Sequence, residues 1–400
     1  MLLGIGPDGP VRGRRVAITG LGVLACCGIG VEAFWDGLQR PAPDGPRTVP
    51  GFDPTTMFGP KEVRRIDRFA QFTVAVAEEA LADAGDIGAD PDRSGVVFGT
   101  GVGGFESLQD QVRVFYEKGA RRVSPFLIPM MMSNAGAATV SMRTGFRGPC
   151  ETVVTACAAG THAVAAAARL VAMGRCDVAI GGGAEAAMTE VGITAFSNMT
   201  ALSSDGVSRP FDAARNGFVI AEGAGAVVLE DYDHARRRGA RIYGELLGAG
   251  SSADAHHITA PAPGGNGAAA CMELALADAQ LAPSAIGHIN AHGTSTPLND
   301  LAEAQAIAKV FGSPGPAVTS TKGVTGHTLG GAGAIEAVAA TLTIDRRLIP
   351  PTFGFEHMDP EIHIDLVTGA PRSWEPTPVL SNSFGFGGHN GCLVIGPPTG

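Results

Sequence analysis

Cys157 stands where an apolar segment that ends at Ala156 meets the start of an alanine-rich helical segment. A thiol at a helix N-terminus faces the positive end of the peptide dipoles, which predicts a lowered thiol pKa and a reactive thiolate. Backbone N–H groups of the same turn can donate to an oxyanion formed when the thiol attacks a carbonyl group. The setting therefore predicts a nucleophile, and a small buried structural cysteine is the ordinary alternative.

Two histidines follow predicted strands and are flanked by glycine. His292 comes after the strand expected over residues 288–291, and His327 follows the one expected over residues 317–320. The C-terminal ends of strands are where α/β sheets carry their sites. A lone histidine is more often a core or surface residue, but two in the same setting favour a functional pair. Three nearby charged residues predict an ion-pair network around the two histidines: Lys322, Asp300 and Glu303. Ordinary surface charge is the alternative.

A glycine-rich segment from Asn382 to Asn390 contains two aromatic rings. Its glycines, Gly387 among them, would let the backbone bend or swing, so that Phe384 or Phe386 covers a site. A tight loop with two core phenylalanines is the alternative.

The elements that must position these residues alternate between strand and helix. Expected strands cover residues 15–20, 95–99, 153–156, 176–183 and 225–230, and then 242–248, 288–291, 317–320, 379–381 and 392–395. Helical spacing appears after most of them, which predicts an α/β fold with mostly parallel sheets. Because the two series have a similar order, we expect a duplicated architecture. Its expected parts are a loose tail over residues 1–13, a first half over 14–248 with Cys157, and a second half over 249–400 with both histidines.

The segment from Gly20 to Ala25 formally matches the dinucleotide fingerprint after a strand. The residues that follow interrupt the helix that this fingerprint requires, and no acidic residue stands at the expected distance. A nicotinamide oxidoreductase is therefore a weak alternative.

Composition narrows the class of protein. The chain has 400 residues, of which 45% are hydrophobic and 17% are charged, and this favours a large buried core. Its net charge of −10 argues against a general nucleic-acid binder. Seven cysteines without zinc spacing argue against a disulfide framework and favour a reducing, cytoplasmic setting. We find no apolar run that would span a membrane and no signal peptide.

Five segments, in this order, resemble the β-ketoacyl synthases, specifically the elongating type (ketosynthase II-like) of dissociated fatty-acid and polyketide systems. The resemblance runs from about residue 15 to about residue 397. The segments that carry it are VVTACAAGTHA, RPFDAARNGFVIAEGAG, NAHGTSTPLND, STKGVTGHTLGGAGAIE and NSFGFGGHN. A Cys-His-His set separates this family from relatives that use Cys-His-Asn or a second cysteine.

The resemblance implies the thiolase fold, in which two similar α/β halves with mixed sheets stack in five layers (αβαβα). It implies a homodimer, or a heterodimer with a partner ketosynthase-like subunit, and neither a metal nor a cofactor. The implied reaction transfers an acyl chain from acyl carrier protein to Cys157. His292 and His327 then promote decarboxylation of a malonyl thioester, and the resulting enolate attacks the acyl-enzyme.

The resemblance also assigns supporting roles. Lys322 supports the site electrostatically, with Asp300 and Glu303 in its network. The amides of Cys157 and Phe386 hold the oxyanion, and Phe386 is the gating ring in the loop with Phe384 and Gly387. The acyl tunnel is lined by Leu108, Met130, Met132 and Phe196. A second loop at the entrance contains Asp254, His257 and Thr259.

Carrier proteins are acidic, so an acidic chain needs local basic patches to dock them. Two segments match the docking regions of the family, and ordinary solvated charge is the alternative. Arg64 and Arg68 are four residues apart and are expected on one helical face. The two sets are Lys61, Arg64, Arg65 and Arg68, and then Lys118, Arg121 and Arg122.

Other functions remain open besides fatty-acid elongation. One is a specialised polyketide ketosynthase that works with a chain-length-factor-like partner. A non-condensing partner subunit is disfavoured because Cys157 is present. A coenzyme A thiolase is disfavoured because no CxG signature appears near the C-terminus.

Overall fold

The computed structural model describes residues 1–6 and 9–399. A mixed sheet forms the centre of the first half, in the order β6–β5–β7–β8–β3. β5 pairs in parallel with β6 and β7, whereas β8 is antiparallel to both β7 and β3. These strands are β3 (Val16–Ala25), β5 (Ser94–Gly99), β6 (Cys150–Val153), β7 (Val178–Glu185) and β8 (Gly223–Asp231).

The sheet of the second half repeats this order as β11–β10–β15–β16–β9, with β13 added outside β11. β10 is parallel to β11 and β15, and β16 is antiparallel to β15 and β9. The predicted duplication is thus visible strand by strand. The strands are β9 (Gly244–Ala253), β10 (His288–Asn290), β11 (Ala317–Thr319), β13 (Asp365–Leu366), β15 (Val379–Gly385) and β16 (His389–Gly396).

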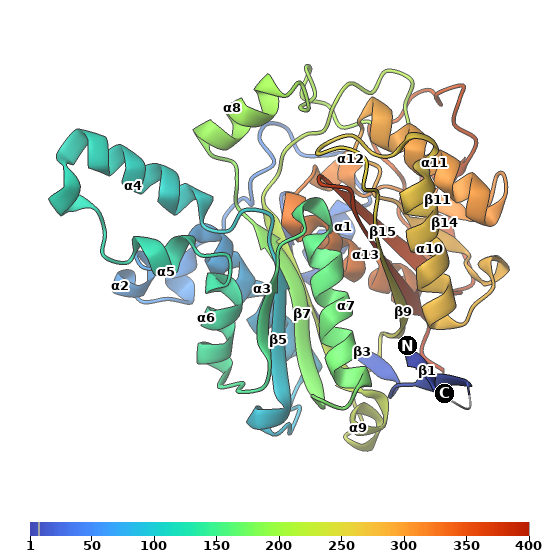
Figure 1. Ribbon diagram of the computed structural model, residues 1–400, viewed down its shortest axis with the longest axis horizontal. Coiled ribbons are helices and arrows are strands. Elements are labelled where there is room, and N and C mark those ends of the chain that lie inside the picture. The colour runs from blue at the N-terminus through green and yellow to red at the C-terminus, as the bar shows by residue number, and fades with distance from the viewer. Residues whose placement is uncertain (7–8, 400) are drawn as a thin grey trace.

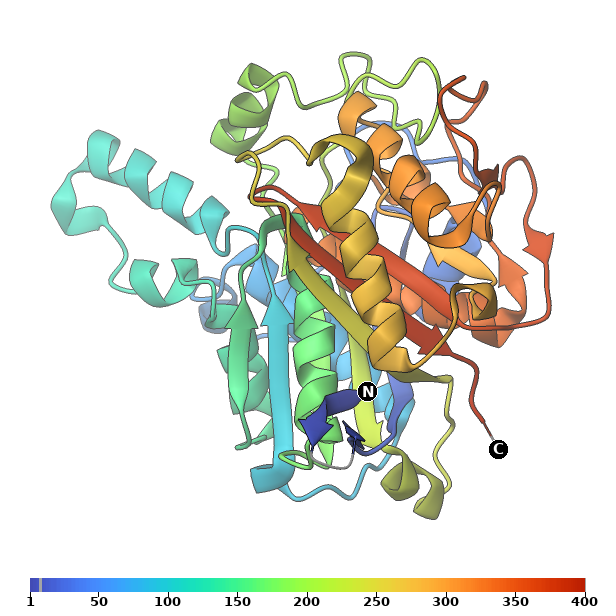
Figure 2. The same ribbon diagram turned by 45° about the vertical axis from the view of Figure 1, so that its right-hand side comes forward.

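Two central helices lie between the sheets, which gives the five layers of the thiolase fold (Figure 1; Figure 2). They are α7 (Ala159–Ala172) and α13 (Ala332–Arg346). Their many alanine and glycine residues allow the two helices and both sheets to approach closely. The outer layers are α3 (Arg68–Ala84) with α6 (Ala135–Thr144) on one side, and α10 (Asn266–Ala279) with α11 (Pro297–Phe311) on the other.

The two sheets also meet edge to edge, because β3 pairs with β9 at Ala17–Glu245 and Ile18–Gly244. Hydrogen bonding therefore continues through a single 12-stranded sheet. The expected division at residue 248 falls inside β9, and the strand order assigns the whole of β9 to the second half.

Glycines in β3 and β9 let a helix lie directly on each strand. A Cβ atom at Gly22 would lie 2.0 Å from the carbonyl oxygen of Val76 in α3, and one at Gly250 would lie 2.1 Å from that of Cys271 in α10. The Gly20–Ala25 segment is therefore the second part of a strand rather than a phosphate-binding turn. This removes the nicotinamide alternative, because the fingerprint requires the glycines to lie between a strand and a helix.

The remaining elements surround this body. The α4–α5 segment projects from it as an arm (Figure 1). Residues 2–6 and 9–12 pair as antiparallel strands β1 and β2, where a loose tail was expected. The other elements are β4 (Gly28–Ile29), α1 (Val31–Gly37), α2 (Pro60–Val63), α4 (Phe105–Lys118), α5 (Leu127–Met131), α8 (Glu190–Asn198), α9 (Tyr232–Arg237), α12 (Lys322–Thr325), β12 (Leu348–Ile349) and β14 (Arg372–Ser373). In the described part of the chain, no helix has both the length and the apolar composition to cross a membrane.

Candidate active site

Cys157 lies in a short 3₁₀ turn, Ala156–Ala158, between the end of β6 and the start of α7. Ala156 has a φ of 49°, a left-handed conformation that non-glycine residues rarely adopt. Gly385 packs against this turn, since a Cβ atom there would lie 2.9 Å from the carbonyl oxygen of Thr155 and 3.0 Å from the Cys157 nitrogen. The strained turn places the thiol at the N-terminal end of the central helix, as the sequence predicted.

The protonation state of Cys157 differs from the prediction. Only 7% of the residue is exposed, and burial raises the pKa of the thiol to about 11. A hydrogen bond from the Phe386 backbone and the charge of Lys322 act in the opposite direction but do not outweigh burial. The predicted lowering of the pKa is therefore wrong, and the thiol is neutral at pH 7.

The two histidines come from the second half of the chain. His292 follows β10, and His327 follows α12, with 2% and 3% of their surfaces exposed. Their ring centroids are 5.3 Å apart, and both rings line the same cavity as Cys157. The fold thus brings together three residues, of which Cys157 and His327 are the farthest apart in the chain, at 170 positions (327 − 157).

Both imidazoles are neutral at pH 7. Burial lowers the pKa of His292 well below its ordinary value, and the charge of Lys322 lowers it further. The same two causes, in the same order, lower the pKa of His327. A neutral imidazole still has one N–H donor, which is what stabilisation of a developing oxyanion requires.

The predicted ion-pair network needs correction. The buried ion pair of Lys322 is with Glu336, a residue the sequence interpretation did not single out. Lys322 Nζ also lies 3.3 Å from Nδ1 of His292. Because an ammonium group has only donors, Nδ1 must accept, and Nε2 of His292 then carries the ring proton.

Glu303 and Asp300 bind backbone groups and do not pair with Lys322. Glu303 accepts hydrogen bonds from the N–H groups of His292 at 2.8 Å and Gly293 at 2.7 Å. Asp300 accepts from the N–H groups of Phe211 at 2.8 Å and Ser295 at 3.1 Å. Burial raises the pKa of both carboxyl groups, to about 7 for Glu303. Their function is therefore to hold the backbone around His292.

The glycine-rich loop lies over the same cavity. The Phe384 ring is 5.9 Å from the His292 ring, centroid to centroid, and the Phe386 backbone hydrogen-bonds to Cys157. Gly387 has a φ of 82°, and its N–H donates to the carbonyl oxygen of Ile258 at 2.7 Å. The loop is thus joined to the second predicted entrance loop.

That second loop contributes Asp254 and Thr259 to the cavity wall but not His257. Nδ1 of His257 instead accepts from the N–H groups of Thr259 and Ala260, both at 3.1 Å.

The cavity has a volume of about 510 Å³, within the range of small-molecule sites. Its wall is mostly apolar, and its larger apolar side chains are Phe196, Met199, Phe218 and Leu329. Of the predicted acyl-tunnel residues, only Phe196 lines it. Leu108, Met130 and Met132 do not, because they belong to the projecting α4–α5 arm, where Met132 is 46% exposed.

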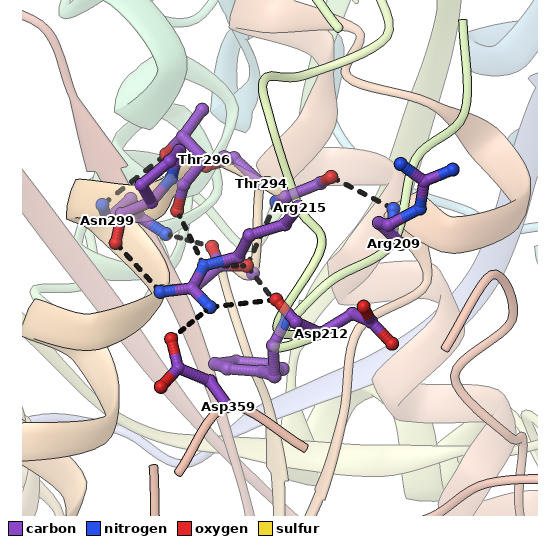
Figure 3. A network of polar contacts seen from close by, with 12 residues as sticks. Arg209, Asp212, Arg215, Thr294, Thr296, Asn299 and Asp359 are labelled. Atoms are coloured by element: carbon purple, nitrogen blue, oxygen red, sulfur yellow. Dashed lines mark hydrogen bonds and ion pairs between the residues drawn. The ribbon is translucent and has the colours of Figure 1, made fainter. Parts of the chain in front are cut away.

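A buried arginine ties the polar rim of this cavity together (Figure 3). The Arg215 guanidinium donates to the carbonyl oxygens of Thr296 at 3.2 Å and Pro297 at 3.0 Å. It also donates to Oδ2 of Asp359 at 2.6 Å. Thr296 and Pro297 line the cavity, as does Asn216 beside the arginine. Sequence reasoning did not single out Arg215, although it lies inside one of the five quoted segments.

A second carboxyl group that was not predicted lies behind the cavity wall. Glu185 accepts hydrogen bonds from the N–H groups of Gly101 at 2.6 Å and Gly330 at 3.0 Å, and from the Thr100 hydroxyl at 2.9 Å. Burial raises the pKa of Glu185 to about 7. This residue fixes two wall segments that flank Cys157.

The basic segments are partly available for docking. Lys61, Arg64 and Arg65 are exposed. Arg68 donates two hydrogen bonds to Glu222, at 2.8 and 2.6 Å, so it is not a free surface charge. Arg64 and Arg68 do not share a helical face, because α2 ends at Val63 and α3 begins at Arg68. The other set is exposed at the far end of α4 and in the turn after it, at Lys118, Arg121 and Arg122.

Metal-ligand geometry is absent from the described residues, since no group of three or more His, Cys, Asp or Glu side chains is arranged to hold an ion.

Comparison with known proteins gives consistent matches over almost the whole chain. Residues 45–235 match the family described as "Beta-ketoacyl synthase, N-terminal domain", and residues 243–356 match "Beta-ketoacyl synthase, C-terminal domain". A relative from Synechocystis, named 3-oxoacyl-[acyl-carrier-protein] synthase 2, is 43% identical over 408 residues, covering 96% of this chain and 98% of the relative.

Solved structures agree with the fold. The ishigamide ketosynthase/chain length factor superposes with a TM-score of 0.90 at 33% identity, covering 97% of this chain and all of that one. A ketosynthase bound to a hexaketide, in complex with its type II polyketide acyl-carrier protein, superposes with a TM-score of 0.85 at 31% identity, with the same coverage.

Proposed function

Because this chain belongs to the β-ketoacyl synthase family, we propose that its cavity catalyses the elongating step named for its relatives. The reaction is a decarboxylative Claisen condensation of an acyl thioester on Cys157 with malonyl-(acyl carrier protein). The products are β-ketoacyl-(acyl carrier protein) and CO₂. The enzyme is thus an acyltransferase, a 3-oxoacyl-[acyl-carrier-protein] synthase of fatty-acid or type II polyketide chain elongation.

The first half-reaction forms the acyl-enzyme. Cys157 Sγ attacks the carbonyl carbon of the acyl carrier thioester, and the carrier leaves as its free thiol. The backbone N–H groups of Cys157 and Phe386 stabilise the oxyanion of the tetrahedral intermediate. The bond from the Phe386 backbone to Cys157 supports this assignment, because it places that amide beside the sulfur.

The second half-reaction uses the neutral histidines. Loss of CO₂ from the malonyl group leaves an enolate, whose negative oxygen accepts hydrogen bonds from His292 and His327. The enolate carbon then attacks the acyl-enzyme carbonyl, and Cys157 is the leaving group. Lys322 supports this step through its contact with Nδ1 of His292, which leaves the ring proton on Nε2.

The observation that carries the proposal is the shared cavity: one thiol from the first half and two neutral imidazoles from the second half line it. Its apolar wall beside the thiol suits an aliphatic or polyketide chain. Phe196 lies in this wall, and Leu108, Met130 and Met132 of the α4–α5 arm stay proposed acyl-pocket residues.

The partners of the reaction are acyl-loaded and malonyl-loaded carrier proteins. We propose that they dock on the exposed residues of the two basic segments. We propose a homodimer as the assembly, located in the cytoplasm, without a metal or a cofactor.

A second candidate is a specialised polyketide ketosynthase that pairs with a chain-length-factor-like subunit. The polyketide ketosynthases among the solved structures favour it. The higher identity to the Synechocystis relative favours fatty-acid elongation. A non-condensing role is the least favoured, because Cys157 is present in the cavity.

The deciding experiment supplies malonyl carrier protein and a ladder of acyl carrier proteins, and reads the products by mass spectrometry. Wild-type protein alone should form β-ketoacyl carrier protein. Cys157→Ala should lose acyl transfer, whereas His292→Ala and His327→Ala should still become acylated but condense at least 100-fold more slowly, about the loss of one oxyanion donor. Condensation at the wild-type rate by either histidine variant would contradict these roles. Activity that appears only with an added partner subunit would favour the second candidate.

A further inference from the structure

His162 lies in α7, five residues after Cys157, and the reaction described above gives it no role. Its Nδ1 atom is 2.8 Å from the hydroxyl oxygen of Thr155. Its Nε2 atom is 3.1 Å from the backbone carbonyl oxygen of Asn390 and 3.2 Å from the hydroxyl oxygen of Ser251. One imidazole therefore contacts the segment before the nucleophile, the strand after the glycine-rich loop, and β9.

The partners fix the tautomer of this ring. A carbonyl oxygen can only accept a hydrogen bond, so Nε2 carries the proton and donates to Asn390. Nδ1 then accepts from the Thr155 hydroxyl. Each ring nitrogen thus bonds to a different segment of the site: Nε2 donates to Asn390, and Nδ1 accepts from Thr155.

The Nδ1 bond holds the turn of the nucleophile. Thr155 precedes Ala156, whose φ of 49° is strained, and Ala156 precedes Cys157. Strained backbone persists only where the surroundings hold it in place. The bond between Thr155 and His162 closes this turn onto the helix that follows it.

The Nε2 bond holds the far end of the glycine-rich loop. Asn390 lines the cavity, and its Nδ2 atom donates to Oδ1 of Asp254 in the second entrance loop at 2.8 Å. Gly391 keeps room for the ring, because a Cβ atom there would lie 3.0 Å from Nε2 of His162. The imidazole is therefore linked to the glycine-rich loop and to the second entrance loop through Asn390.

We propose that His162 is a positioning residue whose two ring nitrogens have separate roles: Nδ1 holds the nucleophile's turn, and Nε2 holds the base of the glycine-rich loop. This inference rests on the proposed condensation, in which the Cys157 and Phe386 amides must point at one oxyanion. The two amides belong to the two segments that His162 joins.

Two substitutions separate the two bonds. His162→Asn keeps an acceptor near the position of Nδ1 but cannot reach Asn390. His162→Gln keeps an amide donor near the position of Nε2 but offers no acceptor to Thr155. His234→Asn is the matched control, because His234 lies in α9 and its Nδ1 contacts Glu230.

Two measurements report separately on the nucleophile's turn and on the entrance loops. Alkylation of Cys157 by iodoacetamide, followed on the Cys157 peptide by mass spectrometry, reports on the turn. The KM for malonyl carrier protein, measured apart from kcat, reports on the loops. We expect His162→Gln to change the alkylation rate roughly three- to tenfold, and His162→Asn to raise KM by a similar factor, which is the effect of one lost hydrogen bond.

Each variant should stay within about twofold of wild type in the other readout, and Thr155→Val should reproduce the pattern of His162→Gln even if a histidine variant fails to fold. Equal losses in both readouts for both substitutions would assign His162 a purely structural role and overturn the inference. Unchanged values for both would overturn it too. Failure of the wild-type protein to condense would instead contradict the proposed function.

Discussion

The neutral thiol of Cys157 is a residue-scale feature with a direct consequence for reactivity. Only the thiolate attacks an alkylating agent, and with a pKa of about 11 about one thiol in a thousand is ionised at pH 8. The enzyme therefore does not keep Cys157 as a standing thiolate. Its nucleophile must lose a proton as the acyl thioester arrives.

This gives a prediction for the pH dependence of alkylation. Raising the pH converts more of the thiol into thiolate, so the rate at Cys157 should increase about tenfold per pH unit from pH 7 to pH 10. The measurement is the iodoacetamide rate on the Cys157 peptide, with exposed Cys150 in the same protein as an internal comparison. A plateau between pH 7 and pH 8 would show that the helix dipole dominates over burial.

At this scale, the sequence predicted which residues form the site better than it predicted their ion-pair and hydrogen-bond partners. Cys157, His292 and His327 stand next to strand ends and glycines, and these local signals can be read along the chain. The ion pair of Lys322 with Glu336 links residues on α12 and α13 that only the packed helices bring together. The pKa of Cys157 could not be predicted either, because its sign depends on how deeply the turn is buried.

At the scale of elements, the site depends on how closely helices approach strands. Gly22 in β3 and Gly250 in β9 occupy matching places in the two halves, each beneath an outer helix. Gly22 is also one of the glycines that matched a nucleotide-binding fingerprint in the sequence. A strand that needs space for a helix backbone and a turn that needs space for a phosphate both select glycine, so the pattern alone does not separate them.

Adding one methyl group at either glycine should destabilise the fold. Gly22→Ala and Gly250→Ala each place Cβ about 2 Å from a backbone carbonyl oxygen that cannot move aside, and we expect a loss of about 1–3 kcal/mol or more in the free energy of unfolding. Urea denaturation measures it. Gly59→Ala is the control, since its Cβ would meet nothing within 4 Å at a φ of −65°. Equal stability of all three variants would contradict the packing described here.

Helices that bury one face were predictable, whereas the projecting arm was not. α3 shows clear helical spacing because ten of its residues are buried. In α4 only Ser107 is buried, and Phe115 and Tyr116 are exposed by 49% and 82%. A helix that packs against no core has no buried face, so its apolar residues do not recur at the helical period of 3.6 residues. Three residues predicted to line the acyl tunnel belong to this arm and do not line the described cavity, so their role stays a prediction: Leu108, Met130 and Met132.

At the scale of the whole molecule, an enzyme with a net charge of −10 must attract an acidic carrier through local charge. The exposed side chains at the end of α4 and beside α2 meet this need, and Arg68 does not, because Glu222 already neutralises it. Docking should therefore depend on a smaller basic surface than the sequence indicated.

Reversing these charges should weaken docking without damaging the chemistry. Arg121→Glu with Arg122→Glu should raise the KM for acyl carrier protein roughly tenfold, while acylation of Cys157 by a small acyl thioester stays unchanged. The effect should diminish at high salt, because screening weakens the attraction in wild-type protein too. Arg236→Glu on α9 serves as the control. An equal rise in KM for the control would point to net charge rather than to a docking site.

The repeated strand order gives the five strands of the first sheet counterparts in the second sheet. Cys157 precedes the central helix of the first half, and Leu329 lies in the matching turn before that of the second. His292 is the second residue after β10, and Gly101 is the second residue after the matching strand β5. In the proposed reaction, one member of each matching pair carries the chemistry. The other member serves as scaffolding, as the hydrogen bond from the Gly101 N–H to Glu185 illustrates.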